Sequence, residues 1–191
     1  FQPMIAPDLI EAVSATPLFF LTLWMAACAV MLRAAELGDR PTLVTRGGGN
    51  GESFGISLAA KPRSWISVPA QPPQGWRLPS APAAAEVFGA VGDSAVIDLL
   101  GLGAQRIAFA PEPLGVLGPW LPADHSGIAE KTFCLIDTRI EAPALLGLDA
   151  QRVVRSNTAP LVALAMIGAD GKSGLLGRGV YRPPVALFRQ A

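Results

Sequence analysis

The sequence predicts an α/β fold in which a compact mixed sheet packs around a long buried helix, with loops rich in glycine and proline. Three observations lead to this prediction. A run of 18 residues without charge, from Ala15 to Leu32, indicates one long apolar helix. Several short segments rich in β-branched residues indicate strands. The 20 glycines and 18 prolines among 191 residues indicate frequent turns between these elements.

The long helix is expected from about Pro17 to Leu37. Thr16 before Pro17 is a typical helix start, and Gly38 is a typical helix end. The uncharged run reaches the minimum length of a membrane span, which is the alternative interpretation. Arg33 and Glu36 continue the helical run, and no basic region precedes it as in a signal peptide. A buried helix of a soluble protein is therefore favoured.

Turn residues divide the remaining chain into short elements. Strands are expected at 42–45, 54–60, 65–68, 106–110, 133–136, 153–154 and 161–167, the last being a buried helix in the alternative interpretation. Shorter helices are expected at 7–15, 95–100 and 124–130, the first with a loop as its alternative. Prolines over 69–85 predict an extended, irregular segment. Five glycines over 168–179 predict either a backbone-lined wall or a mobile connection.

Composition limits the classes of function. With 15 basic and 15 acidic residues, the chain has no net charge that would attract nucleic acid or an anionic membrane surface. The length fits a single domain over residues 1–191. Because 51% of residues are apolar and only 16% are charged, we expect part of the surface to pack against another chain. The chain starts at Phe1 rather than methionine, so we expect it to be part of a longer protein.

Cysteine and histidine usage offers no metal site. Cys28 and Cys134 lie in apolar surroundings without a CxxC pattern, which is typical of buried, reduced thiols in the cytoplasm. His125 is the sole histidine, so neither a histidine-rich metal site nor a Ser-His-Asp triad is expected. The residues specify no cofactor.

The glycine-rich run from Thr45 to Gly55 is the best candidate site. Glycines permit the left-handed angles of a backbone N–H nest around a phosphate, carboxylate or carbonyl, and Arg46 and Asn50 offer directed donors. The run matches neither a Walker motif nor a dinucleotide-binding motif. A hairpin turn of the Asn-Gly type explains the same residues equally well.

A second candidate is Gly92-Asp93-Ser94 before the helix expected at 95–100. Asp93 and Ser94 at a helix start are compatible with an anion held by the first amide groups, and Asp98 is a candidate base. The alternative, which these residues favour, is an Asp or Ser cap at the start of the helix and a glycine cap at Gly101.

Taken together, these segments resemble a bacterial family. They are Asn50-Gly51-x-x-Phe54-Gly55-Ile56, then Pro69-Ala70 with its proline-rich sequel, then Gly92-Asp93-Ser94-Ala95 and Gly101-Leu102-Gly103, and finally Gly177-x-Gly179-Val180 and Arg182-Pro183-Pro184. In order and spacing they resemble the DUF1116 family, which includes the ylbE-type subunit linked to oxamate carbamoyltransferase. The likeness extends from about Leu18 to Phe188.

The resemblance implies a cytoplasmic, multi-subunit enzyme of purine-nitrogen (oxalurate and allantoin) breakdown that transfers a carbamoyl group. It also implies that this chain is the C-terminal part of a longer subunit that associates with other subunits or copies and binds a small anionic substrate. The expected substrate-binding residues are Arg46, Gly48, Asn50, Gly51, Gly55, Asp93 and Ser94; the family pattern supplies no catalytic residues.

The sequence departs from the family pattern in two places. Gly49 stands where an arginine often precedes Asn-Gly, and Ala163-Leu164-Ala165 with Gly168-Ala169 stands where Asn-Thr-Gly and a later His-Lys are common. Two polar anchors are thus missing. The alternative function is therefore a non-catalytic structural or assembly subunit of the same kind of enzyme.

Overall fold

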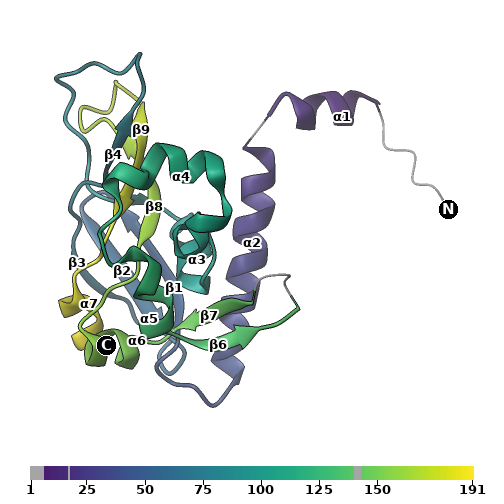
Figure 1. Ribbon diagram of the computed structural model, residues 1–191, viewed down its shortest axis with the longest axis vertical. Coiled ribbons are helices and arrows are strands. Elements are labelled where there is room, and N and C mark those ends of the chain that lie inside the picture. Colours follow the sequence, from purple (N-terminus) through teal and green to yellow (C-terminus); the bar gives the residue numbers. More distant parts are fainter. Residues whose placement is uncertain (1–6, 17, 140–142) are drawn as a thin grey trace.

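The computed structural model describes residues 7–16, 18–139 and 143–191 (Figure 1). The strands are β1 (Val44–Asn50), β2 (Ser53–Leu58), β3 (Ile66–Pro69), β4 (Gln74–Arg77), β5 (Val91–Gly92), β6 (Phe133–Asp137), β7 (Ala144–Leu148), β8 (Val162–Ile167) and β9 (Leu175–Tyr181). The helices are α1 (Pro7–Ser14), α2 (Phe19–Ala34), α3 (Ala95–Leu100), α4 (Pro111–Leu117), α5 (Ile128–Thr132), α6 (Ala150–Ser156) and α7 (Val185–Arg189). Short 3-10 helices are η1 (Ala35–Leu37), η2 (Gly103–Phe109), η3 (Gly118–Trp120) and η4 (His125–Gly127).

The strands form separate antiparallel sheets. One sheet has the order β3-β2-β1-β5, a second has the order β4-β9-β8, and β6 pairs with β7. The predicted α/β class is confirmed, but the strands do not form one mixed sheet. Adjacent strands such as β1 and β2 are joined by short turns, which allow only antiparallel pairing.

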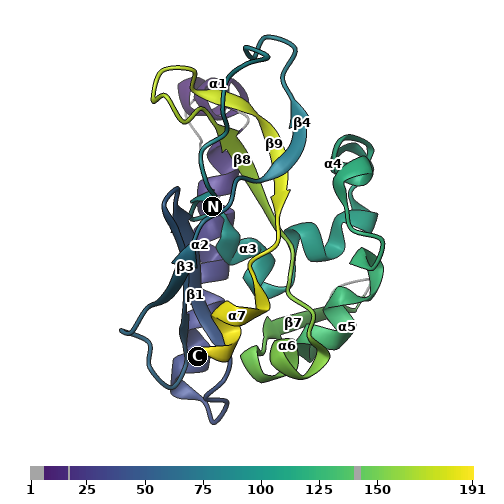
Figure 2. The same cartoon turned by 90° about the vertical axis from the view of Figure 1, so that its left-hand side faces the viewer.

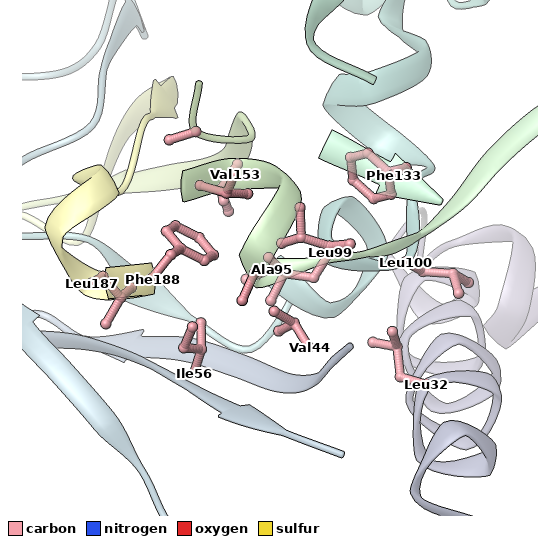
Figure 3. Packing of buried hydrophobic residues seen from close by; sticks show 14 of the residues in the cluster. Leu32, Val44, Ile56, Ala95, Leu99, Leu100, Phe133, Val153, Leu187 and Phe188 are labelled. Atoms are coloured by element: carbon pink, nitrogen blue, oxygen red, sulfur yellow. The ribbon is translucent and has the colours of Figure 1, made fainter. Parts of the chain in front are cut away.

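Helix α3 lies at the centre of the molecule and packs on α2, β1, β7 and β8 (Figure 2). Its Ala95 and Leu99 are fully buried, and Leu100 is almost so. Figure 3 shows these side chains between Val44 of β1 and Phe133 of β6. A helix of only six residues is thus stabilised by the apolar surface around it rather than by its own length.

The long helix is present, but the prediction that it is buried was wrong. Along α2 only Cys28 and Leu32 are buried, on the face that packs against α3 and β1. The opposite face exposes Phe20, Leu23 and Val30, and Figure 1 shows α2 at the edge of the molecule. The helix is apolar on nearly every side, whereas this chain covers only one of them. The predicted start at Pro17 lies outside the described residues.

Among the described residues, one helix, Phe19–Leu37, is long and apolar enough to cross a membrane by length and composition. Its packing argues against a span, because Cys28 and Leu32 belong to the same core as Leu99 of α3. A lipid-surrounded helix would have to leave that core.

Two short predicted strands were wrong. Of the strand predicted at 106–110, residues 106–109 belong to η2, and the strand predicted at 153–154 lies inside α6, which is capped by the Asp149 carboxylate. The segment 69–85, predicted to be irregular, contains one strand. This strand is β4, which has no proline and pairs with β9. Most other predicted elements are present, including the strand at 161–167, which is observed as β8.

The glycines of β1 and of the turn that follows it allow close packing against residues 88–92. A Cβ at Gly49 would overlap the Ala90 carbonyl oxygen, and one at Gly51 would overlap the Phe88 ring. The Gly51 amide donates to the Ala90 carbonyl at 3.0 Å. The glycine-rich run is therefore a closely packed strand and turn, not a loose loop.

Replacing Gly49 by alanine should destabilise the protein by about 1–3 kcal/mol, because the new methyl group forces β1 away from the Ala90 backbone. Urea unfolding would measure the loss. Gly115 of α4 is a matched control, since a Cβ there meets nothing within 4 Å and alanine favours a helix. Equal effects of Gly49→Ala and Gly115→Ala would contradict the close-packing explanation.

Candidate functional site

The glycine-rich run forms a β-hairpin. Asn50 Oδ1 accepts hydrogen bonds from the amides of Glu52 at 3.0 Å and Ser53 at 2.7 Å, which closes an Asx-type turn. Gly51 follows with a φ of +89°, a left-handed angle that favours glycine. Gly51 is the sole residue in this run with such an angle. The nest interpretation was therefore wrong, and the alternative Asn-Gly hairpin is correct.

An open hollow of about 750 Å³ lies beside this hairpin. Gly48 of β1 and Gly55 of β2 are direct cross-strand partners, so their missing side chains leave a bare stretch of sheet. The hollow is lined by Gly47, Gly48, Gly49, Asn50, Ser53, Gly55, Trp65, Ser67, Val91, Gly92 and Asp93. Segments far apart in the sequence thus meet at one site.

The structure brings together four of the seven predicted binding residues. Gly48, Asn50, Gly55 and Asp93 line the hollow. A Cβ at Gly48 would lie 3.0 Å from the Gly92 carbonyl oxygen, so the strand and the segment before α3 almost touch there. The two candidate motifs found in the sequence therefore converge on one site.

The other three predicted residues have different surroundings. The Arg46 guanidinium donates to the Glu36 carboxylate at 3.1 Å, so its charge is already paired. Gly51 lies under Phe88 at the hairpin turn. Ser94 immediately precedes α3 and makes no side-chain hydrogen bond to the helix, so the predicted cap by this side chain is absent.

Trp65, Ser53 and Ser67 line the hollow but were not predicted as site residues. The Trp65 ring lies against Gly55, since a Cβ on that glycine would be 3.1 Å from ring atom Cε3. Ser67 is the cross-strand partner of Gly55 on β3. The sequence shows a tryptophan at the start of a predicted strand. It does not show that this strand pairs with the one that contains Gly55.

Asp98 is buried in the core and does not line the hollow. Its carboxyl group accepts hydrogen bonds from the Ala104 amide at 2.6 Å and the Ala163 amide at 3.2 Å. Burial raises the pKa of Asp98 to about 8, although both hydrogen bonds act in the opposite direction. Asp98 thus links α3 to β8, and its position does not support the role of a base at the hollow.

The cysteines are free thiols. Cys28 is buried against α3, and burial, followed by the nearby Asp98 carboxyl, raises the pKa of its thiol. Cys134 is half-buried, and burial likewise raises its pKa. Within the described part of the chain, no three His, Cys, Asp or Glu residues are grouped so as to hold a metal ion.

Comparison with known proteins gives a match over the first half of the chain. Residues 3–94, which include the hairpin and the segment before α3, match the family described as oxamate carbamoyltransferase subunit AllG. The chain is similar to AllG. This match supports the predicted link to oxamate carbamoyltransferase. It does not support the predicted family name, DUF1116.

Two proteins of Escherichia coli (strain K12) are similar over nearly the whole chain. The oxamate carbamoyltransferase subunit AllG is 27% identical over 193 residues, covering 96% of this chain and 46% of that protein. The uncharacterized protein YahG is 29% identical over 194 residues, covering 96% and 40%, respectively. The chain therefore spans less than half the length of these relatives.

A crystal structure of a conserved protein of unknown function from Enterococcus faecalis V583 has the same fold. The two structures superpose with a TM-score of 0.80 at 22% sequence identity. The matched region covers 97% of this chain and 47% of the Enterococcus faecalis protein. This similarity supports the fold alone. That the chain is a single domain at the C-terminal end of a longer subunit stays a prediction.

The stability of the protein should fall as pH rises from about 4 to about 8. In this window the folded state keeps the Asp98 proton that the unfolded state has released. The free energy of unfolding therefore decreases as pH rises and becomes constant above about 8. Urea unfolding between pH 5 and pH 9 would measure the slope.

Asp98→Asn is the control for this slope, because asparagine has a similar shape and does not ionise. The variant should be less stable at low pH but nearly independent of pH across the same window. A slope equal to that of the unmodified protein would show that another group titrates.

Proposed function

We propose that this chain is part of a subunit of an oxamate carbamoyltransferase-like enzyme and that the hollow over Gly48 and Gly55 binds the transferred group. The observation that carries the proposal is the convergence of both candidate motifs on one hollow. The similarity to AllG includes the residues of that hollow, since the matched segment ends at residue 94.

The proposed reaction exchanges a carbamoyl group between oxalurate and phosphate in cytoplasmic purine-nitrogen breakdown. An oxygen of phosphate bonds to the ureido carbonyl carbon, the C–N bond to the oxamate nitrogen breaks, and that nitrogen takes a proton. Oxamate and carbamoyl phosphate are the products. Other subunits of the complex are proposed to complete the catalytic machinery.

The contribution of this chain is to bind and orient. Hydrogen-bonding groups of Asn50, Ser53 and Ser67 surround a floor without side chains. Asn50 uses its carbonyl oxygen in the hairpin turn, whereas its amide nitrogen makes no hydrogen bond to the described residues and is available to a ligand. Fixed groups of this kind accelerate a reaction by holding the reactants in a productive geometry.

Filling the hollow should reduce carbamoyl transfer. Gly48→Val places methyl groups over the floor, so the assembled enzyme should lose about tenfold or more in kcat/KM for oxamate and carbamoyl phosphate. Gly127→Val is the matched control, because a Cβ at Gly127 meets nothing within 4 Å and lies outside the hollow. Circular dichroism would confirm that both variants fold. Full activity of Gly48→Val would contradict the proposal.

A second candidate function, an assembly subunit without chemistry of its own, is favoured by the exposed face of α2. Phe20, Leu23, Trp24, Val30 and Met31 are all exposed, and they follow the three- and four-residue spacing of one helix face. An apolar stripe of this length is typical of a protein-protein contact. We propose that this face packs against the remainder of the multi-subunit enzyme.

A charge on this face should break the assembly while leaving the chain folded. Val30→Glu, at a residue 70% exposed, should shift the complex to smaller species in size-exclusion chromatography with light scattering. Leu175→Glu is the control, since that side chain is also half-exposed and belongs to β9, a strand that lies away from α2 (Figure 1). Retention of the full complex by Val30→Glu would contradict a contact through α2.

A further inference from the structure

The floor of the hollow is suited to a flat group. Gly48 and Gly55 face each other across the ladder of β1 and β2, so two neighbouring positions of the sheet present peptide planes without side chains. A tetrahedral group would touch such a floor at few atoms, whereas a planar group can lie on it with full contact.

Trp65 forms an aromatic wall next to this floor. Its ring lies over the edge of Gly55, yet 57% of the residue is exposed. Tryptophan buries a large area when it is covered, and its ring stacks readily on planar groups. An exposed ring that borders a hollow is therefore well placed to pack against a flat ligand that lies on the floor.

The charges around the hollow disfavour an anion at its centre. Asp93 is the one charged side chain among the described residues that line it. Arg46, on the same strand as Gly48, has its charge paired with Glu36 at 3.1 Å. A carboxylate or phosphate placed beside Asp93 would be repelled, whereas an N–H group could donate to that carboxylate.

The neutral groups complete the description of the ligand. The Asn50 amide nitrogen and the hydroxyl groups of Ser53 and Ser67 can donate to a carbonyl oxygen. The lining thus offers an acceptor on one side, donors on the other, a flat floor and an aromatic ring beside that floor. That combination complements a planar amide or ureido group.

We propose that the hollow binds the planar amide or ureido end of the substrate, with the Asp93 carboxylate accepting a hydrogen bond from its N–H group and Trp65 packing against it. This inference rests on the proposed function and narrows it, because it assigns the hollow to the nitrogen-bearing end rather than to phosphate. Asp93 then determines specificity, and Trp65 supplies contact area.

Oxamate and oxalate test this assignment, since they are nearly the same size and differ in an amide replaced by a carboxylate. Isothermal titration calorimetry of the assembled enzyme should show oxamate binding about tenfold or more tightly than oxalate. In Asp93→Asn the preference should fall to about threefold or less, because the amide of asparagine also donates to a carboxylate.

Trp65 is tested with the same two ligands. Trp65→Ala should weaken oxamate binding about tenfold, whereas Trp65→Phe should keep it within about threefold, since a ring is retained. Trp76→Phe on β4 is the control, because Trp76 is partly exposed but does not line the hollow. Oxamate should quench tryptophan fluorescence in the Trp76→Phe protein but not in the Trp65→Phe protein.

Two results would overturn the inference. Oxalate or inorganic phosphate binding as tightly as oxamate would show an anion site, and an unchanged preference in Asp93→Asn would remove the role of that carboxylate. The transfer assay with Gly48→Val tests the proposed function separately. If that variant loses activity but the hollow of the unmodified enzyme binds anions, only the present assignment is rejected.

Discussion

The fold depends on a strand, β1, whose middle stretch from Gly47 to Gly49 carries no side chains. Because Gly49 has no Cβ, residues 88–92 can lie directly against β1, and Gly47 leaves room for Leu99 of α3. The run of glycines has two results. It places the central helix and the segment before it on the sheet, and it leaves the outer side of the same strand, at Gly48, bare. The core and the candidate site thus have a common origin.

The buried Asp98 adds a polar connection to this apolar centre. Its two oxygens accept from backbone amides on either side of α3, one at Ala104 and one at Ala163 of β8. A hydrophobic contact could slide, whereas two directed hydrogen bonds define the position of the helix relative to the second sheet. The high pKa of this carboxyl reflects its burial and has no need of a catalytic explanation.

Sequence reasoning located most elements and part of the site, and failed where tertiary contacts decide. The long helix and the strand at 162–167 follow from apolar runs, but the exposure of α2 depends on what packs beside it. The pair Val153-Val154 favoured a strand, whereas the Asp149 cap makes it helical. The glycine run could be located but not interpreted, because the angles and partners of each glycine depend on residues 40 positions away. Trp65 was missed for the same reason.

The hairpin turn has a consequence for the chemical lifetime of the protein. Asparagine followed by glycine is prone to deamidation, in which the glycine nitrogen attacks the side-chain carbonyl carbon of the asparagine and ammonia is lost. Here the Gly51 N–H donates to the Ala90 carbonyl, and the Asn50 oxygen accepts from two amides, so both reacting groups would have to give up hydrogen bonds before the attack. The hydrogen bonds that hold this hairpin turn therefore also slow the deamidation of Asn50.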